Sequence, residues 1–411
     1  MKHRVSFVNR ALVVSAVVLA AFVGFSRTIG GSTDVSMSAI ELRPGVYVAT
    51  EATALPLAAS GYDLYVVGET HGANETVSFF LHYLERLHRT VALRDVALEA
   101  SPVFERGIDE FVAGLETTLP DLWYWELAGA DKVALVRGIR AMNEALPEEE
   151  RVRVHLIDLD FGYELIHRHV LAVREDLGEI ADSIDIPSLS GFEQLSEDEM
   201  LSLVDRLGTL AGDEGYVLDE LRGLRASVRF RFVRAQVDRW EAASNECTAI
   251  RDEAIAENLR RLLQCSTDAP VLVLFGGAHV QKARIIPGVA VRSQTVAIEE
   301  PYWAERLNEE GTALYSLLTG GLSGSVASHG AIIRVSVNPS ELHFPDGVTL
   351  GDLLVGLSDY RFVYVDLRNS GNALATLGEG FSPQTARFDP EKSAGEAFDG
   401  ILLFERLTPA R

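Results

Sequence analysis

The chain has 411 residues, of which 47% are apolar and 24% charged, and its 60 acidic and 37 basic side chains give a net charge of −23. This is a globular composition, which excludes a coiled coil, a collagen-like rod and a largely disordered chain. A surface of this charge repels phosphate backbones, so we expect no nucleic-acid partner. Two cysteines are too few for a disulfide framework or a thiolate zinc site. The remaining class is an acidic, core-rich protein of one large or two ordinary domains, most often an enzyme.

Residues 1–33 are predicted to be a signal or membrane-anchor segment followed by a linker. Lys2, Arg4 and Arg10 precede an apolar run over residues 11–25. The run is shorter than the ~20 residues of a membrane-spanning helix and suits the apolar core of an export signal. We therefore expect export to the periplasm or beyond. Either the segment is cleaved, or residues 11–25 stay as an anchor in the cytoplasmic membrane.

Four short apolar runs, each bounded by turn or polar residues, predict the strands of a sheet: 62–68, 96–99, 152–158 and 271–276. Between the first two, apolar residues recur at helical spacing over 75–89, behind a predicted cap at Asn74. Strands that alternate with helices are typical of a parallel sheet buried on both faces. The predicted fold class is α/β, with a central, largely parallel sheet and flanking helices.

The expected domain covers 45–411 and contains a helical insertion over about 164–264, where the sequence is strongly charged and helical in pattern. Three further strands are predicted over 332–337, 361–367 and 400–405. Cys247 and Cys265 flank a predicted helix. If that helix is continuous, they lie roughly 27 Å apart, beyond the reach of a disulfide.

All four predicted strands end in residues that can carry chemistry. Glu69 and His71 follow the first strand, Glu99 the second, Asp158 the third and His279 the fourth. In an open α/β sheet such residues meet at the carboxyl edge, where ligands bind. A histidine beside a carboxylate can take a proton from water near neutral pH. Two imidazoles with acidic oxygens can instead hold a metal ion.

The order of the motifs along the chain resembles that of erythromycin esterase-like proteins. The matching segments are VVGETHGANE, VALEAS at 96–101, IRAMNEAL, VRVHLIDLD, IRDEAIAENLRRLL at 250–263, GGAHV at 276–280 and the ending FDGILLFERLTPAR. The paired Gly68-x-x-His71 and Gly276-x-x-His279 also resemble the Tiki/TraB metalloproteases of the wider superfamily. ChaN-like haem-binding proteins share a similar GExH start.

The resemblance implies an exported hydrolase that acts on an ester or amide bond of a small molecule. His71 would activate water with support from Glu69 or Glu99, and His279 would lie across the pocket. Arg251 and Asp158 are the expected substrate-binding residues. The chain departs from the esterase pattern in the Glu–His spacing around Thr70.

Two further positions differ from the esterases. Phe80 replaces an arginine of the following helix, and Gly276 replaces the earlier of two C-terminal histidines. These changes put macrolide hydrolysis in question and move the site toward the Tiki/TraB pattern.

Three site chemistries follow. The preferred one is a His/Glu pair without a cofactor. The alternative is a hydrolase or peptidase that holds Mn, Co or Zn through His71, His279, Glu69 and Glu99. A haem protein with Tyr62, Tyr65 and His71 as candidate iron ligands is the third.

Overall fold

The computed structural model describes residues 38–119, 130–212, 215–235, 240–266, 269–285, 288–291, 294–328, 331–369, 374 and 392–410. Residues Ala39–Arg411 form one compact unit, whose first strand begins at Ile40, ahead of the expected boundary at 45. The expected signal or anchor over 1–33 lies outside the described residues. Within the described ranges, no helix combines the length and the apolar character needed to cross a bilayer.

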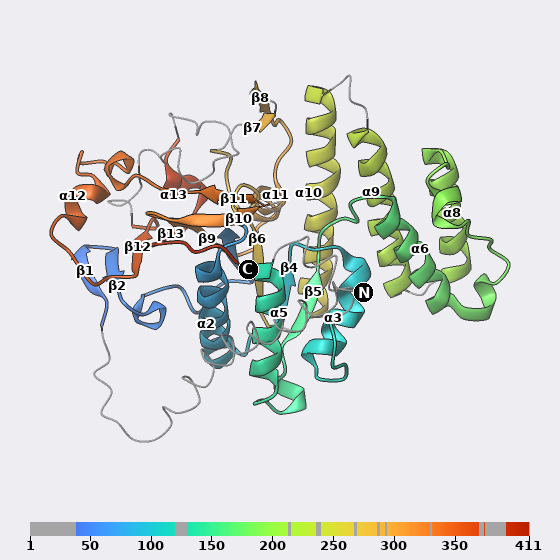
Figure 1. Ribbon diagram of the computed structural model, residues 1–411, viewed down its shortest axis with the longest axis horizontal. Helices are drawn as coiled ribbons and strands as arrows, with labels where there is room; N and C mark the ends of the chain where they lie inside the picture. Colours follow the sequence, from blue (N-terminus) through green and yellow to red (C-terminus); the bar gives the residue numbers. More distant parts are fainter. Residues whose placement is uncertain are drawn as a thin grey trace, which may run out of the picture. The chain divides into compact units, whose positions relative to one another are not determined.

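A mostly parallel sheet is the centre of this unit (Figure 1). In the described part of the chain it has nine strands in the order β1-β2-β12-β13-β9-β3-β6-β4-β5. The strands are β1 (Ile40–Arg43), β2 (Val46–Ala49), β3 (Leu64–Glu69), β4 (Asp95–Leu98), β5 (Arg153–Leu156), β6 (Val271–Gly276), β9 (Leu314–Gly321), β12 (Phe362–Asp366) and β13 (Gly400–Phe404). From β13 to β5 all neighbours run parallel, and β12, β2 and β1 add antiparallel pairs at one edge.

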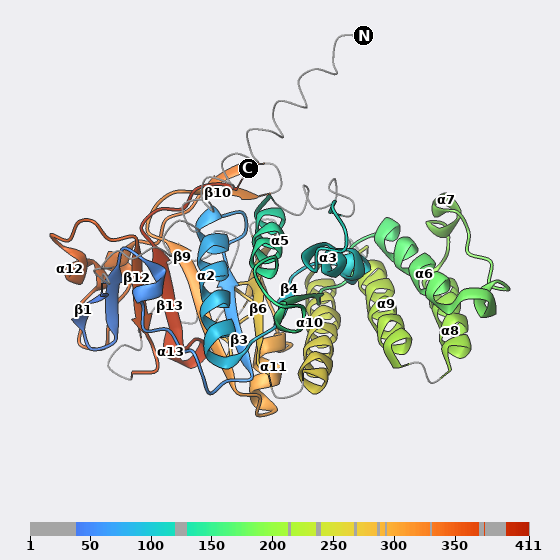
Figure 2. The ribbon, with the colours of Figure 1, turned by 90° about the horizontal axis from the view of Figure 1, so that it is seen from below.

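Helices cover both faces of the sheet, which explains why its central strands are apolar throughout. Along β3, Tyr65 and Val67 pack into one apolar layer, whereas Leu64 and Val66 pack into the other. The first layer is closed by α2 (Asn74–Val91), α3 (Glu105–Val112) and α5 (Ala130–Asn143), which lie together on one face (Figure 2). The second is closed by α10 (Trp240–Cys265), α11 (Trp303–Glu309) and α13 (Ala394–Ala397). The predicted α/β class is confirmed.

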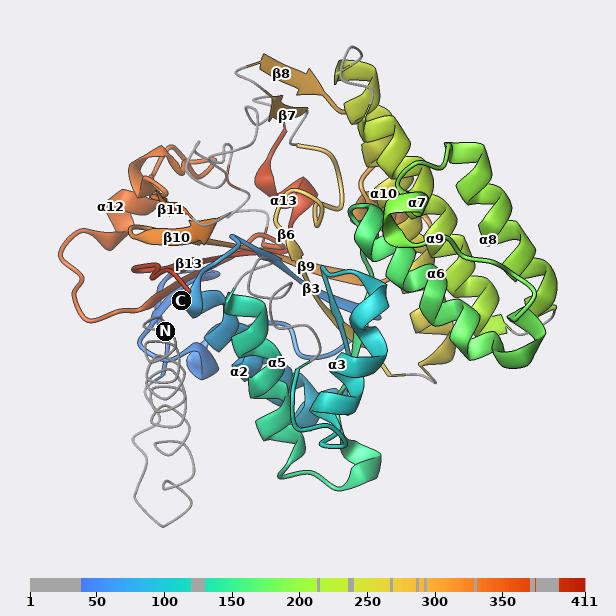
Figure 3. The ribbon, with the colours of Figure 1, turned by 45° about the vertical axis from the view of Figure 1, so that its right-hand side comes forward.

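The helix α10, at the end of the range 164–264 predicted as a helical insertion, packs against the sheet. A helical bundle lies beside it in the rest of that range (Figure 3). It consists of α6 (Tyr163–Leu177), α7 (Leu189–Phe192), α8 (Glu197–Ala211) and α9 (Gly215–Arg234), which share an apolar core of their own. Asp160, just beyond β5, ties the bundle to the sheet. Its carboxylate binds His169 Nδ1 of α6 at 2.7 Å, and its amide donates to Ser227 Oγ of α9 at 3.0 Å.

The remaining elements are small. Two hairpins lie outside the central sheet, β7 (Gly288–Val291) with β8 (Gln294–Ala297) and β10 (Ser325–Ser328) with β11 (Ala331–Arg334). A short helix, α12, covers Leu350–Leu354.

Several details differ from the sequence-based expectation. The strand predicted over 332–337 is β11, which pairs only in its hairpin. The predicted cap Asn74 lies inside α2, and its side chain instead reaches Thr408 and Pro409. The antiparallel β1–β2 pair and the central strand β9 were not anticipated.

The sequence pattern did not predict β9 because Ser316, Thr319 and two glycines interrupt its apolar run. The fold satisfies these hydroxyls internally: Thr319 Oγ1 donates to Gly68 O at 2.8 Å, and Ser316 Oγ donates to Val280 O at 2.5 Å. The cysteine prediction is confirmed, since Cys247 and Cys265 are free thiols on one continuous helix.

Candidate functional site

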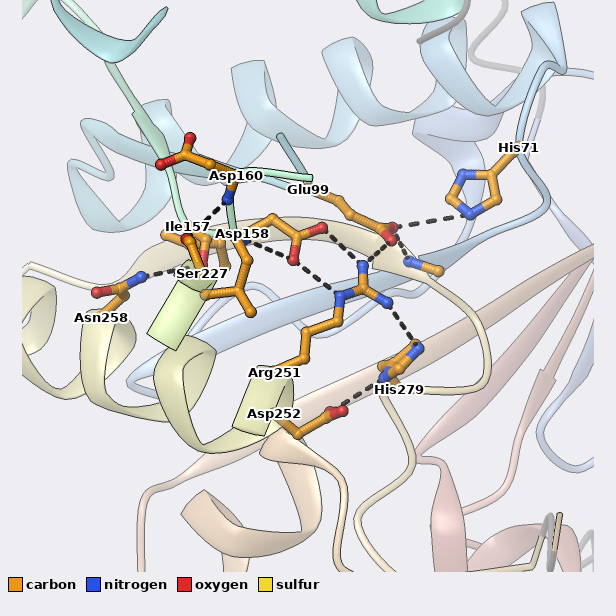
Figure 4. Close-up of polar contacts among 12 residues, drawn as sticks. His71, Glu99, Ile157, Asp158, Asp160, Ser227, Arg251, Asp252, Asn258 and His279 are labelled. Carbon is orange, nitrogen blue, oxygen red and sulfur yellow. Dashed lines mark hydrogen bonds and ion pairs between the residues drawn. The ribbon is translucent and has the colours of Figure 1, made fainter. Parts of the chain in front are cut away.

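Six polar side chains meet at the carboxyl edge of the central strands. Because β3, β6, β4 and β5 are parallel neighbours, the segments that follow them emerge on the same edge. The side chains are Glu69, His71, Glu99, Asp158 and His279 from the strand ends and Arg251 from the middle of α10. Figure 4 shows most of this network, with Arg251 at its centre.

His71 is held by a buried carboxylate. Its Nδ1 lies 2.9 Å from Glu69 Oε1, and the same oxygen accepts a bond from the ammonium of Lys132 on α5. The Glu69 and Lys132 side chains are 1% and 5% exposed, whereas His71 is 53% exposed. The imidazole is therefore the solvent-facing end of a buried ion pair.

Glu99 connects the two halves of the site. Its Oε2 lies 3.7 Å from His71 Nε2 and accepts a 2.7 Å bond from the amide of Gly276. Its Oε1 accepts a 2.6 Å bond from Arg251 Nη2. Gly276 permits this approach, because a Cβ there would lie 3.2 Å from His71 Nε2 and 3.3 Å from Glu99 Oε2.

Arg251 uses three nitrogens within the network. Nε and Nη2 bind the two oxygens of Asp158 at 2.8 and 2.6 Å, which is the fork geometry that a guanidinium favours. Nη1 lies 3.3 Å from His279 Nε2. The guanidinium is also about 5 Å from the ring centres of Phe161 and Phe275, which limit its access to water.

His279 lies between an acid and Arg251. Its Nδ1 is 3.0 Å from Oδ1 of Asp252, a fully buried residue whose same oxygen accepts a bond from the amide of Trp303. The carboxylate orients Nδ1 as a donor, which leaves Nε2 as an acceptor toward Arg251. The ring also contacts Tyr302 edge-on, with 5.0 Å between the ring centroids.

These contacts set the charge states of the site. Burial alone would raise the pKa of Glu69, but Lys132 and His71 outweigh it and lower that pKa to about 2. Desolvation by the buried groups around the ring would lower the pKa of His71, but the carboxylates of Glu99 and Glu69 raise it to about 9. The pKa of Glu99 is lowered despite burial, chiefly by His71 and Arg251. The pKa of Asp158 is raised, since its burial outweighs the attraction of Arg251.

The structure brings all six predicted site residues into one chain of contacts, although one expectation needs correction. Arg251 lies well inside α10. Of the four predicted metal ligands, Glu69, His71 and Glu99 have ligand atoms within 4.8 Å of one another, whereas His279 is not part of that group in the described residues.

Three residues of the site were missed by the sequence reasoning. Lys132 binds Glu69, Asp131 accepts a 2.8 Å bond from the amide of Gly72, and Asp252 orients His279. All three are buried helical residues. The available signal was a charged residue within an otherwise apolar helical face, seen at Asp131-Lys132.

The candidate haem ligands are not brought together with His71. Tyr65 is fully buried within β3, where it packs edge-on against Tyr62 and Tyr83. Between Tyr65 and the end of β3 at Glu69 the chain advances roughly 13 Å along the strand at ~3.3 Å per residue, and His71 lies beyond that end. Phe80 is also fully buried.

No protein-family model matches the sequence. No curated protein has a significantly similar sequence. Solved structures nevertheless share the fold over 85% of the chain. A crystal structure of a Bacillus cereus protein matches with a TM-score of 0.60 at 15% identity, over 90% of that chain. A mutant of the erythromycin esterase EreC, in its open conformation, matches with a TM-score of 0.59 at 13% identity, over 92% of that chain.

A protein described as a succinoglycan biosynthesis protein matches with a TM-score of 0.56 at 14% identity, over 85% of this chain and 88% of that one. This chain therefore has the α/β fold of the erythromycin esterase. The resemblance stated from the sequence motifs is confirmed at the level of the fold.

Proposed function

We propose that the protein is an exported hydrolase of ester bonds in small molecules, with His71 as the general base. The observation that carries this proposal is the contrast in exposure within one hydrogen-bonded pair, His71 at 53% and Glu69 at 1%. A buried, ionised carboxylate fixes the ring through Nδ1, so that Nε2 is presented to water and substrate. The esterase-like fold provides independent support.

The chemistry balances with the chain's own groups. His71 Nε2 takes a proton from water, and the resulting hydroxide attacks the ester carbonyl carbon. The carbon–oxygen bond to the alcohol then breaks, and the imidazolium returns its proton to the departing alkoxide. Glu69 stabilises the imidazolium between these steps.

Arg251, which lies on the side of Glu99 opposite His71, supplies the positive charge for the developing oxyanion. Arg251 is oriented there by its two bonds to Asp158, and His279 lies against Arg251 Nη1. In this proposal Arg251 stabilises the oxyanion, Asp158 positions Arg251, and His279 lies across the pocket from His71. A preorganised cation of this kind takes the role of the arginine that Phe80 replaces.

The donor set favours chemistry without a metal ion. Glu69, His71 and Glu99 have the spacing of a candidate cation site, but Glu69 Oε1 and both oxygens of Glu99 already accept bonds from the chain. Lys132 binds Glu69 Oε1, while Arg251 and Gly276 N bind the two oxygens of Glu99. A divalent ion would have to compete with two buried cations, and their charges would repel it.

A panel of small aryl and alkyl esters and lactones tests the proposal with the purified full-length protein. We expect hydrolysis by the wild type and a loss of at least about 100-fold in His71→Ala, in line with the ~10²–10⁴-fold contribution of general base catalysis. His82→Ala, at a half-buried histidine of α2 outside this network, is the matched control and should keep full activity. Full activity in His71→Ala would refute the assignment.

The metal question is decided on the same protein. We expect activity to survive exhaustive chelation and not to rise on addition of Mn²⁺, Co²⁺ or Zn²⁺. Activity that chelation abolishes and one of these ions restores would establish the metal-dependent alternative instead.

Export rests on the basic and apolar pattern of residues 1–33. Fused to a reporter that is active only outside the cytoplasm, this segment should confer activity, and replacing Lys2, Arg4 and Arg10 by glutamate should reduce it. Sequencing the N-terminus of the exported protein then distinguishes a cleaved signal from a retained anchor.

A further inference from the structure

Two consecutive residues of α5 hold both sides of the segment that carries His71. Lys132 binds the carboxylate of Glu69, two residues before His71, and Asp131 Oδ2 accepts the amide of Gly72, the residue after it. Both α5 side chains belong to buried residues, 3% exposed for Asp131 and 4% for Lys132. No other lysine in the described residues binds a carboxylate as buried as Glu69.

The carbonyl of Gly72 is held as firmly as its amide. It accepts bonds from Ala327 N at 3.1 Å and from Ala410 N at 2.9 Å. Gly72 has a φ of +77°, and a Cβ there would lie within 1.8 Å of Ala327 O. The backbone beside His71 is therefore fixed by three separate parts of the chain, of which only α5 also contributes charge.

The charges facing His71 come from every element around it. Glu69 and Glu99 are the nearest carboxylates, and Lys132 is the nearby cation that opposes them. Asp131 lies on the same helix turn as Lys132, while Arg251 and His279 act on the far side of Glu99. Without Lys132, Glu69 would be a buried carboxylate whose remaining partner is His71, and such a charge is costly unless it is well paired.

We propose that Lys132 is a positioning residue of the hydrolase site, which keeps Glu69 ionised and aimed at His71 Nδ1, and that Asp131 clamps the adjoining backbone. This inference rests on the proposed function for its catalytic meaning. The contact itself does not depend on the substrate: the buried ammonium of Lys132 binds Glu69 Oε1, the oxygen that also orients His71.

The first test is a titration of the His71 ring by NMR, which requires no activity. If Lys132 keeps Glu69 ionised and aimed at Nδ1, Lys132→Met should deprive His71 of a carboxylate that raises its pKa, so that pKa should fall toward the value in Glu69→Gln. Glu69→Gln removes a carboxylate that raises it, so there the pKa should fall. Lys282→Met is the matched control, because it breaks a lysine–carboxylate pair with Asp399 outside the network and should leave His71 unchanged. An unchanged or raised pKa of His71 in Lys132→Met would overturn the proposal, whether or not the protein proves to be a hydrolase.

The second test addresses positioning and remains informative if Lys132→Met folds poorly. In the double variant Lys132→Met/Glu69→Gln, position 69 no longer carries a buried charge that has lost its cation, so this variant should be more stable than Lys132→Met alone. Because Lys132 acts through Glu69, adding Lys132→Met to Glu69→Gln should lower kcat/KM by less than about threefold, although Lys132→Met alone lowers it about tenfold or more. Fully additive losses would show that Lys132 does not act through Glu69.

Discussion

Arg251 and Asp158 form a two-bond ion pair across 93 positions of the chain. Nε binds Oδ1 at 2.8 Å and Nη2 binds Oδ2 at 2.6 Å, with side chains 17% and 2% exposed. The pair joins the long helix α10 to the end of β5, and Arg251 Nη2 also reaches Glu99. It therefore determines where the guanidinium lies relative to His71.

Replacing Arg251 by lysine keeps the charge but removes the fork. We expect kcat/KM for ester hydrolysis to fall about 10- to 100-fold, because an ammonium cannot bind both Asp158 oxygens and Glu99 at once. The free energy of unfolding should fall by about 2–3 kcal/mol, since a buried carboxylate loses part of its pairing. Steady-state kinetics and urea unfolding measure the two effects.

The matched control lies on the same helix. Arg260 binds Glu310 through Nε and Nη2 at 2.8 and 2.7 Å, but this pair is at the surface. Arg260→Lys should change stability by less than about 1 kcal/mol and leave activity intact. Equal losses in the two variants would contradict the role assigned to Arg251.

Hydrolysis should rise with pH over the alkaline range. The proposed base is His71 in its neutral form, and its pKa of about 9 means that this form increases as pH rises toward and past that value. Glu99 is the largest of the charges that raise this pKa, so in Glu99→Gln the rise should occur at lower pH. The measurement is kcat/KM from pH 6 to 10 for both proteins, with the midpoint rather than the height as the readout. A midpoint that moves upward in Glu99→Gln would contradict the assignment.

Gly276 provides the space in which His71 and Glu99 approach each other. In Gly276→Ala the new Cβ would press on His71 Nε2 and Glu99 Oε2, and the half-exposed imidazole would be displaced by a few tenths of an ångström. We expect about a tenfold loss of kcat/KM with less than about 1 kcal/mol of destabilisation, since reaction rates depend steeply on small displacements.

Gly223→Ala in α9 is the control for this substitution, because a Cβ there meets no atom within 4 Å. It should leave activity unchanged and raise stability by up to about 1 kcal/mol through helix propensity. Unaltered activity in Gly276→Ala would show that the site tolerates a wider separation.

Stability should depend on pH through His155, away from the site. Burial alone would lower the pKa of His155, but its bonds to Asp95 at 2.9 Å and Glu105 at 3.2 Å raise it to about 9, above the unfolded value of 6.5. Its contribution is thus fully present below pH 6.5 and is lost as pH rises through about 9. His155→Gln should be markedly less stable than the wild type at pH 6 and closer to it at pH 9.5, as measured by urea unfolding. A constant difference across this range would refute the linkage.

Much of the fold was predictable because strands that are buried on both faces of the sheet have a recognisable local sequence pattern. A central parallel strand must be apolar on both sides, so β3 and β6 stand out as uninterrupted apolar runs. β9 has the same environment, but its polar side chains are satisfied by partners distant in sequence, Gly68 O for Thr319 and Val280 O for Ser316. A strand whose polar groups find distant partners cannot be identified from its own pattern.

The site divides in the same way. Residues that directly follow parallel strands share one edge by topology, so Glu69, His71, Glu99, Asp158 and His279 could be grouped from their positions alone. Arg251, Asp252 and Lys132 lie on helices, where the direction of a side chain depends on how the helix packs against the sheet. The local sequence pattern was therefore sufficient to predict which edge of the sheet carries the site residues. The pairing of each acid with its cation arose only in the folded chain, because Lys132 and Glu69, or Arg251 and Asp158, are brought within hydrogen-bond distance by the docking of α5 and α10.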